Sequence, residues 1–269
     1  MNLGDTRVVL RVRTVSEVLD LAFRFLARDT RTYLKASLPT LLPVLGLCAA
    51  ARWIGHWSWG AVWAIAISLG MVVQGAFTVV AGRLLFEERP KVRPLLAKFA
   101  RRLPSYFVML IVTRVLIAVA TLATIPGLFV WQRVAFTHEA NLLEDAGPFA
   151  SLSRSSRFVK RQEMSALGLL VLMLLAQLGF VAVAEALGWG IVEFTLQLGQ
   201  PAGSLRGDGG SLYALAGFLA SVPYVATARF LKYIDIRTRK EGWDIVLRFR
   251  AIQQADEAAR SGRGSRRVA

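Results

Sequence analysis

Five long apolar runs constrain the fold of this chain more than any other feature. Each approaches or exceeds the ~20 residues that cross a bilayer as a helix. Hydrophobic residues make up 55% of the sequence and charged residues only 19%, which lies outside the range of ordinary soluble domains. The sequence therefore predicts an all-α, polytopic membrane helical bundle. The runs cover residues 36–53, 60–85, 106–131, 166–189 and 212–231.

Lysine and arginine gather between these runs and at the two ends of the chain. Residues 1–35 and 83–104 hold seven each, residues 138–163 hold four, and the segment from Arg229 to the end holds eleven. The positive-inside rule places all four basic blocks, and both termini, in the cytoplasm. We therefore read the net charge of +15 as contact with anionic lipid headgroups at the cytoplasmic face, and not as nucleic-acid binding.

The third apolar run must leave the cytoplasm and return to it, because basic blocks lie on both sides of it. A single helix cannot do this. Pro126 and Gly127 supply a turn, since proline interrupts the hydrogen bonds of a helix and glycine tolerates left-handed backbone angles. We predict a broken helical hairpin and about six transmembrane segments in all. Whether the arm over residues 127–143 spans the membrane or is re-entrant stays open.

An amphipathic helix is predicted before the first membrane segment. Thr14 and Glu17 form a capping-box pattern, and an apolar stripe follows at helical spacing. Such a helix is typical of the inner membrane surface. The sequence thus divides into a basic cytoplasmic segment (1–35), a membrane domain (36–232) and a basic cytoplasmic tail (233–269) that is disordered at its end. The stripe comprises Val15, Val18, Leu19, Ala22, Phe25 and Leu26.

Motifs of the common enzyme classes are missing from the sequence. It has two histidines and one cysteine, too few for the usual zinc-binding patterns, so we expect no protein-bound metal. It also lacks the G-x-S-x-G and Walker-type motifs of serine hydrolases and nucleotide-binding proteins. We therefore expect no enzymatic activity, no catalytic residue and no cofactor.

Ionisable residues inside the third apolar run and its returning arm are the better lead, because such groups are costly in hydrocarbon. Arg114, Arg133, His138 and Glu139 form the predicted intramembrane polar cluster. Counting residues along the two arms places Arg114 and Glu139 at similar depth, which predicts a buried ion pair with Thr113 and His138 beside it. Arg133 either extends to the headgroups or lines a cavity.

A second charged group follows the hairpin and the last apolar run. Glu144 and Arg154 lie after the hairpin, and Asp235, Arg237 and Glu241 lie at the end of the last helix. All five belong to cytoplasmic blocks, which predicts a charge clamp that fixes the hairpin to the last helix. The alternative is a solvated juxtamembrane face.

The same two regions carry a resemblance to a known family. Ile125-Pro126-Gly127, a polar-interrupted arm to Glu144, Gly147-Pro148 and the stretch 152–155 (LSRS) resemble the core of bacterial multipass proteins grouped with the membrane domain of glycerophosphoryl diester phosphodiesterases. The ending over residues 233–244 is similar to that group's Y-x-D-x-R-x-R-x-E-G-x-D pattern. The catalytic His-Arg-Gly-type motif of the phosphodiesterase domain is absent, so the resemblance implies a six-helix inner-membrane domain without catalysis.

Three functions remain in order of preference. The first is a non-enzymatic structural or accessory module of the bacterial inner membrane for lipid or envelope processes. The second is a small transporter or lipid-handling protein whose pathway is lined by the broken hairpin. The third is a membrane enzyme acting on lipid. Expected partners are anionic lipid headgroups, with protein partners or a homo-oligomer left open.

Overall fold

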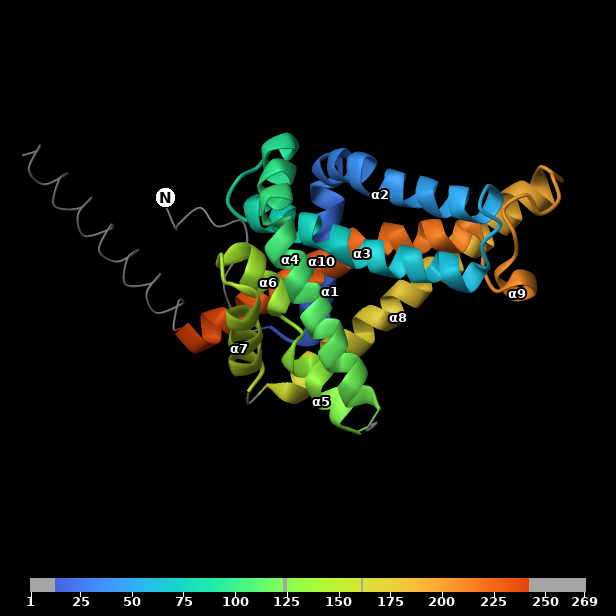
Figure 1. Ribbon diagram of the computed structural model, residues 1–269. Helices are drawn as coiled ribbons and strands as arrows, with labels where there is room; N and C mark the ends of the chain where they lie inside the picture. The colour runs from blue at the N-terminus through green and yellow to red at the C-terminus, as the bar shows by residue number, and fades with distance from the viewer. Residues whose placement is uncertain (1–12, 123–124, 161, 242–269) are drawn as a thin grey trace, which may run out of the picture.

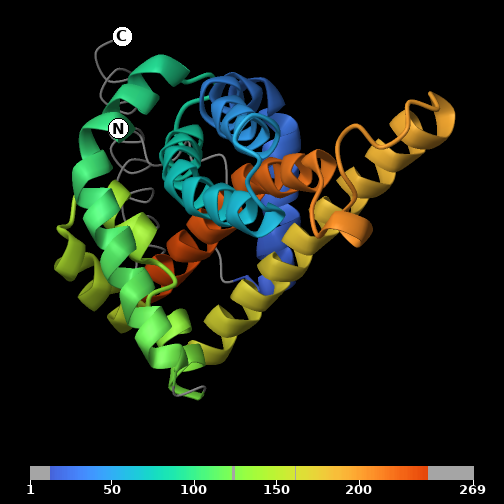
Figure 2. The same ribbon diagram turned by 45° about the vertical axis from the view of Figure 1, so that its right-hand side comes forward.

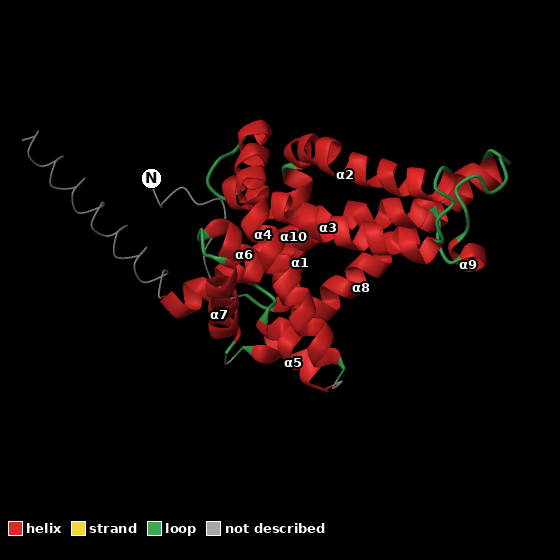
Figure 3. Ribbon diagram, in the orientation of Figure 1, coloured by secondary structure: helices red, strands yellow, loops and turns green. Residues whose placement is uncertain are grey.

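The computed structural model describes residues 13–122, 125–160 and 162–241. Helices joined by short loops make up this part of the chain (Figure 1). No strand occurs in these ranges (Figure 3). Five helices are long and apolar enough to cross a membrane. They are α2 (Thr30–Trp53), α3 (Trp59–Leu84), α4 (Val92–Thr121), α8 (Glu163–Gly188) with its π-helical extension η2 (Trp189–Thr195), and α10 (Leu212–Glu241), whose candidate span ends at Thr238.

Helices α10 and α3 form the centre of the molecule. In the apolar window of α10, 83% of the residues are buried, against 17% for α2. Small residues permit this packing, since close helix contacts in membranes favour glycine, alanine and serine. At Gly217 of α10, an added Cβ would lie 2.5 Å from the carbonyl oxygen of Phe180 in α8. Gly217 therefore sets how closely α8 and α10 approach.

The N-terminal helix α1 (Val15–Arg28) begins at the predicted capping box, in which Thr14 and Glu17 bond to each other's backbone. Its apolar stripe, however, packs on protein. Val18, Ala22 and Phe25 are buried, and the Tyr224 hydroxyl of α10 donates to the Leu19 carbonyl at 3.3 Å. The stripe covers the side of α10. Most of it is therefore not available to lipid, although we expect from the sequence that this helix lies on the membrane surface.

The two ends of the α2–α3 pair differ in chemistry. At one end, beside the short helix α9 (Leu205–Asp208; Figure 1), two tryptophans of α3 contact the residues on either side of α9. Trp63 Nε1 donates to the Gly209 carbonyl at 3.2 Å, and Trp59 packs against Gly203 and Gly210. At the other end, residues 28–35 and 88–92 line one hollow. Two of the predicted cytoplasmic basic blocks thus lie together, away from the tryptophans.

Helix α4 crosses the bundle instead of running beside α3. Its C-terminal end approaches the start of α8 next to α5 (Ile125–Arg133), and α4 and α8 diverge from that point (Figure 2). The predicted sixth crossing is replaced by α5 and α6 (Thr137–Leu143). Nine residues of α5 give roughly 14 Å of helix, too short for a ~30 Å hydrocarbon core. The described residues therefore contain five candidate spans and a broken arm.

The hairpin turn also lies slightly earlier than predicted. α4 ends at Thr121, and Pro126 and Gly127 occupy the first turn of α5. Proline is tolerated there because its missing N–H would have no partner in the helix. An added Cβ on Gly127 would lie 2.9 Å from the Thr121 Cα, so glycine allows the two arms to meet.

Large apolar side chains remain exposed on the outer faces of α2, α4 and α8. Contiguous exposed apolar surface of this extent is a property of membrane or partner contact. With the five candidate spans, it supports an integral membrane protein. Examples are Leu34, Leu38 and Leu42 on α2, Phe107, Ile111 and Val115 on α4, and Leu174, Leu178 and Leu187 on α8.

Candidate functional site

The break between α5 and α6 is closed by a serine from α7 (Pro148–Val159). Ser155 is fully buried; its hydroxyl donates to the Arg133 carbonyl at 2.6 Å and accepts from the Phe136 N–H at 3.0 Å. A broken helix inside a membrane protein needs such partners, because free backbone groups are costly away from water. The returning arm can therefore turn within the protein.

An ion pair lies directly after this break. Glu139 is fully buried on α6, and its Oε1 lies 3.3 Å from the Nε of Arg229 on α10. A second contact of 3.4 Å joins Oε2 to an Arg229 Nη, which also donates to the Ala135 carbonyl. One arginine of the central helix thus holds both the carboxylate and the backbone of the broken arm.

This pairing replaces the expected bond between Glu139 and Arg114. The depth estimate counted residues along one continuous arm, but the arm is broken before Glu139 and follows a different course. Burial raises the pKa of the Glu139 carboxyl, and the charge of Arg229 opposes that rise. Among the described residues, the cation that meets Glu139 comes from the last helix and not from α4.

Tyr106 and His138 lie beside the ion pair. The Tyr106 hydroxyl donates to the Met71 carbonyl of α3 at 3.0 Å and lies 2.6 Å from His138 Nδ1. A hydroxyl has one hydrogen, so Nδ1 must carry the proton and donate to Tyr106. Burial lowers the pKa of His138 well below its ordinary value, and the cations Arg229 and Arg114 lower it further. The imidazole is therefore neutral at pH 7.

A small cavity separates Arg114 from this group. It has a volume of about 20 Å³ and is lined by Arg114, His138 and Arg229, among others. That volume is on the order of one water molecule. The Arg114 Nε is buried there without a hydrogen-bond partner in the described part of the chain. Arg114 and His138 are thus brought together as predicted neighbours, around a space too small for an organic ligand.

Arg133, the fourth member of the predicted cluster, lies outside it. Its side chain is 56% exposed and reaches to 3.9 Å from the Glu163 carboxylate at the start of α8. At that exposure and distance, the pair contributes little to stability. Arg133 is not among the residues that line the small cavity beside Arg114, and its extension to the headgroups stays a prediction.

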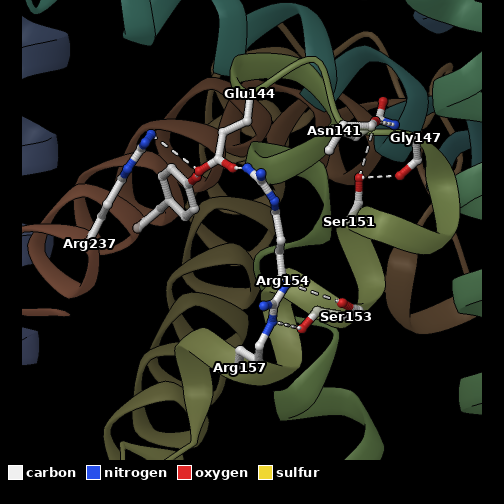
Figure 4. A network of polar contacts seen from close by, with 10 residues as sticks. Asn141, Glu144, Gly147, Ser151, Ser153, Arg154, Arg157 and Arg237 are labelled. Atoms are coloured by element: carbon white, nitrogen blue, oxygen red, sulfur yellow. Dashed lines mark hydrogen bonds and ion pairs between the residues drawn. The ribbon is translucent and has the colours of Figure 1, made fainter. Parts of the chain in front are cut away.

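Glu144, at the end of α6, is the centre of a second polar group (Figure 4). Its side chain is only 5% exposed and forms ion pairs with Arg154 of α7 and Arg237 of α10, the latter at 3.2 Å. The Tyr233 hydroxyl of α10 donates to the same carboxylate. One carboxylate thus connects three helices, which is the geometry of the predicted clamp for these residues.

The other two predicted clamp residues lie differently. Asp235 is buried and pairs with Lys232 at 3.0 Å, and its second oxygen accepts from the Arg13 N–H at 3.1 Å. It therefore ties the start of α1 to α10. The side chain of Glu241 lies outside the described residues.

Arg229, Tyr233 and Ser155 take part in the site and were missed from sequence. Arg229 was counted with the basic tail that sets topology, although it lies within the apolar stretch 222–231. An arginine inside an apolar stretch is the sequence signal that could have identified Arg229 as a buried charge. Ser155 and Tyr233 lie in the two stretches that carry the family resemblance, but the sequence gives neither a role.

The described residues contain no group of three or more histidine, cysteine or acidic side chains that could hold a metal ion. The arrangement can fix helices and neutralise buried charge. Comparison of the chain with protein-family models, with curated proteins and with solved structures finds no match in any of the three.

Proposed function

We propose that this multipass membrane protein is a non-enzymatic structural or accessory module for lipid or envelope processes in a bacterial inner membrane. The observation that carries the proposal is the tightly packed polar centre. Glu139 is paired with Arg229, Tyr106 with His138, and the remaining space measures about 20 Å³. The buried ion pair between Glu139 and Arg229 joins α6 to α10, which is a structural role. The resemblance to the phosphodiesterase-associated membrane domain agrees with this role and remains part of the proposal.

The proposed topology has both termini in the cytoplasm. α2, α3, α8 and α10 cross the membrane four times, and the hairpin of α4 with α5 and α6 enters from the cytoplasmic side and returns to it. This topology keeps the basic blocks on both sides of the hairpin in the cytoplasm with four full crossings. A re-entrant arm is acceptable because its free backbone groups bond to Ser155 and Arg229 within the protein.

The alternative, a small transporter, has one observation in its favour. Arg114 lines the cavity with an Nε that lacks a partner among the described residues. A pathway would require this cavity to widen and to open to water on both sides. An enzyme acting on lipid has the least support, because no described carboxylate cluster or metal group accompanies the cavity.

Cysteine accessibility distinguishes the module from the transporter. In a Cys48→Ala background, which removes the sole native thiol, single cysteines are placed at Thr113 and Ile117 in the cavity wall and at the exposed Phe149. A membrane-impermeant maleimide is then applied to oriented vesicles. We expect labelling of F149C in inside-out vesicles and none at the two cavity positions. Labelling of T113C and I117C from both sides would instead establish a pathway.

Co-purification tests the accessory role itself. The intact chain is released from membranes in mild detergent and its adducts are identified by native mass spectrometry. We expect anionic phospholipids or a protein partner to remain bound, because the cytoplasmic blocks are strongly basic. A chain that retains neither would contradict the proposal.

A further inference from the structure

An apolar groove lies between α1, α2 and α10. Its volume is about 520 Å³, within the range of about 300–1,000 Å³ that is usual for small-molecule sites. The lining is apolar except for Thr30, Tyr33 and Ser37, and the Tyr33 hydroxyl is already bonded to Thr227 at 2.7 Å. Phe23, Leu34 and Leu38 on its rim are exposed. The groove is therefore open sideways, toward the region that lipid occupies.

A basic hollow of about 700 Å³ adjoins one end of this groove. Its lining holds five cationic side chains and two carboxylates, those of Asp29 and Glu88. All five cations are exposed. The excess of positive charge favours an anionic ligand. The cations are Arg28, Arg31, Lys35, Arg89 and Lys91.

Two helices also direct their N-termini into the hollow. α2 begins at Thr30 and α4 at Val92, both of which line it, and neither N-terminus is capped by a side chain. The first N–H groups of a helix and its dipole favour negative charge, and phosphate groups bind there readily. The N-terminus of α4 thus adds to the attraction that the side chains exert, whereas the C-terminus of α1, which ends at Arg28 in the same lining, offsets that of α2.

The groove and the hollow share a residue, Thr30, which lines both. An apolar channel that ends in a cationic hollow matches a molecule with an apolar chain and an anionic head. In the proposed topology the hollow lies at the cytoplasmic interface and the groove in the inner leaflet. A soluble anion would occupy only the hollow, and a neutral lipid would gain nothing from the cations.

We propose that this composite site binds one anionic glycerophospholipid, with its phosphate in the basic hollow and an acyl chain in the α1–α2–α10 groove. The inference rests on the proposed function, since it presumes the membrane position and the contact with anionic lipid. It adds a defined site, in which α1 is held on α10 and α2 contributes both the groove wall and a helix N-terminus.

Paired variants of the full chain test the two halves of the site. R31Q/K91Q removes two cations from the hollow, and K98Q/R101Q removes the same charge from exposed positions of α4 outside it. A220W fills the groove, and A182W adds the same bulk to an exposed position of α8. Each protein is titrated in detergent with phosphatidylglycerol, phosphatidylcholine or inorganic phosphate and observed by native mass spectrometry.

We expect phosphatidylglycerol affinity to fall about tenfold in R31Q/K91Q, since each cation near an anionic headgroup adds attraction. A comparable loss is expected in A220W, with both control variants like the wild type. Phosphatidylcholine and inorganic phosphate should bind weakly to all five proteins. Thermal unfolding identifies any variant that fails to fold; Leu38→Trp in the groove and K35Q/R89Q in the hollow then replace it.

Three results would overturn the inference. The first is equal phosphatidylglycerol affinity in all variants. The second is a loss of this affinity in the hollow variants without a loss in the groove variants. The third is binding of inorganic phosphate as tight as that of phosphatidylglycerol. If the wild type retains anionic lipid from membranes and the variants bind it equally, the accessory role stands and only this site fails. If the wild type retains neither lipid nor partner, the proposed function fails first.

Discussion

Arg229 of α10 and Glu139 of α6 form an ion pair of 3.3 Å although 90 positions separate them in the chain. Arg229 is 9% exposed and Glu139 not at all, and the same guanidinium donates to Ala135 at the break between α5 and α6. The central helix therefore fixes the broken arm of α5 and α6 through charge as well as through apolar packing.

Glu139→Gln should destabilise the protein strongly. The substitution keeps the shape of the side chain but leaves Arg229 buried without a counter-charge, and breaking a buried pair in this way costs about 3–5 kcal/mol. The free energy of unfolding in mild detergent measures the effect. Glu87→Gln, which breaks an exposed pair with Arg83, is the matched control and should cost less than about 1 kcal/mol.

The double variant R229Q/E139Q should be less destabilised than the sum of the two single variants, because neither charge is then left alone. Additive losses would show that the two side chains are not coupled.

The sequence predicted the helices of this fold better than their arrangement. The apolar runs located all five candidate spans, and the pattern at Thr14 and Glu17 gave the start of α1. The direction of α4 and the break at residues 134–136 depend on long-range contacts, such as that of Ser155 with Arg133. Local spacing carries no information about a partner 22 positions away.

The same limit explains the pairing at the polar centre. Arg114, Arg133 and Glu139 were visible as ionisable groups in apolar surroundings, but which cation meets Glu139 depends on the course of α10. The clamp was more accessible to sequence reasoning, since Glu144, Arg154 and Arg237 all lie in basic blocks assigned to one side of the membrane.

Glu144→Gln should loosen the cytoplasmic end of the bundle. The carboxylate receives Arg154, Arg237 and the Tyr233 hydroxyl while almost fully buried. Loss of the charge-assisted bonds should lower the free energy of unfolding by about 2–3 kcal/mol. Glu163→Gln, which removes the 3.9 Å contact with Arg133 at the start of α8, serves as the control. Equal, small effects of the two substitutions would argue for a solvated face in place of a clamp.

Gly75→Ala should disturb the polar centre from the α3 side. An added Cβ would lie 2.6 Å from Phe99 Cε2 and 2.8 Å from Tyr106 Cζ, closer than side-chain contacts allow. Overpacking of this kind costs about 1–3 kcal/mol. Gly60→Ala on the same helix meets no atom within 4 Å and should be nearly neutral. A neutral result at Gly75 in thermal unfolding would mean that Tyr106 moves freely and does not hold His138.

Acid should destabilise the protein through His138, which lies on α6 outside the five candidate spans. Its pKa in the folded state is well below the ordinary value, so the unfolded chain takes up a proton near pH 6.5 that the folded chain does not. The contribution of the neutral His138 to the free energy of unfolding is therefore fully present above that pH. It is lost as the pH falls, by up to about 1.4 kcal/mol per pH unit. His138→Gln should remove this slope between pH 7 and pH 5, whereas His56→Asn, at an exposed loop position, should leave it unchanged. A slope that persists in His138→Gln would assign the acid sensitivity to other groups and contradict the neutral, Tyr106-bonded imidazole.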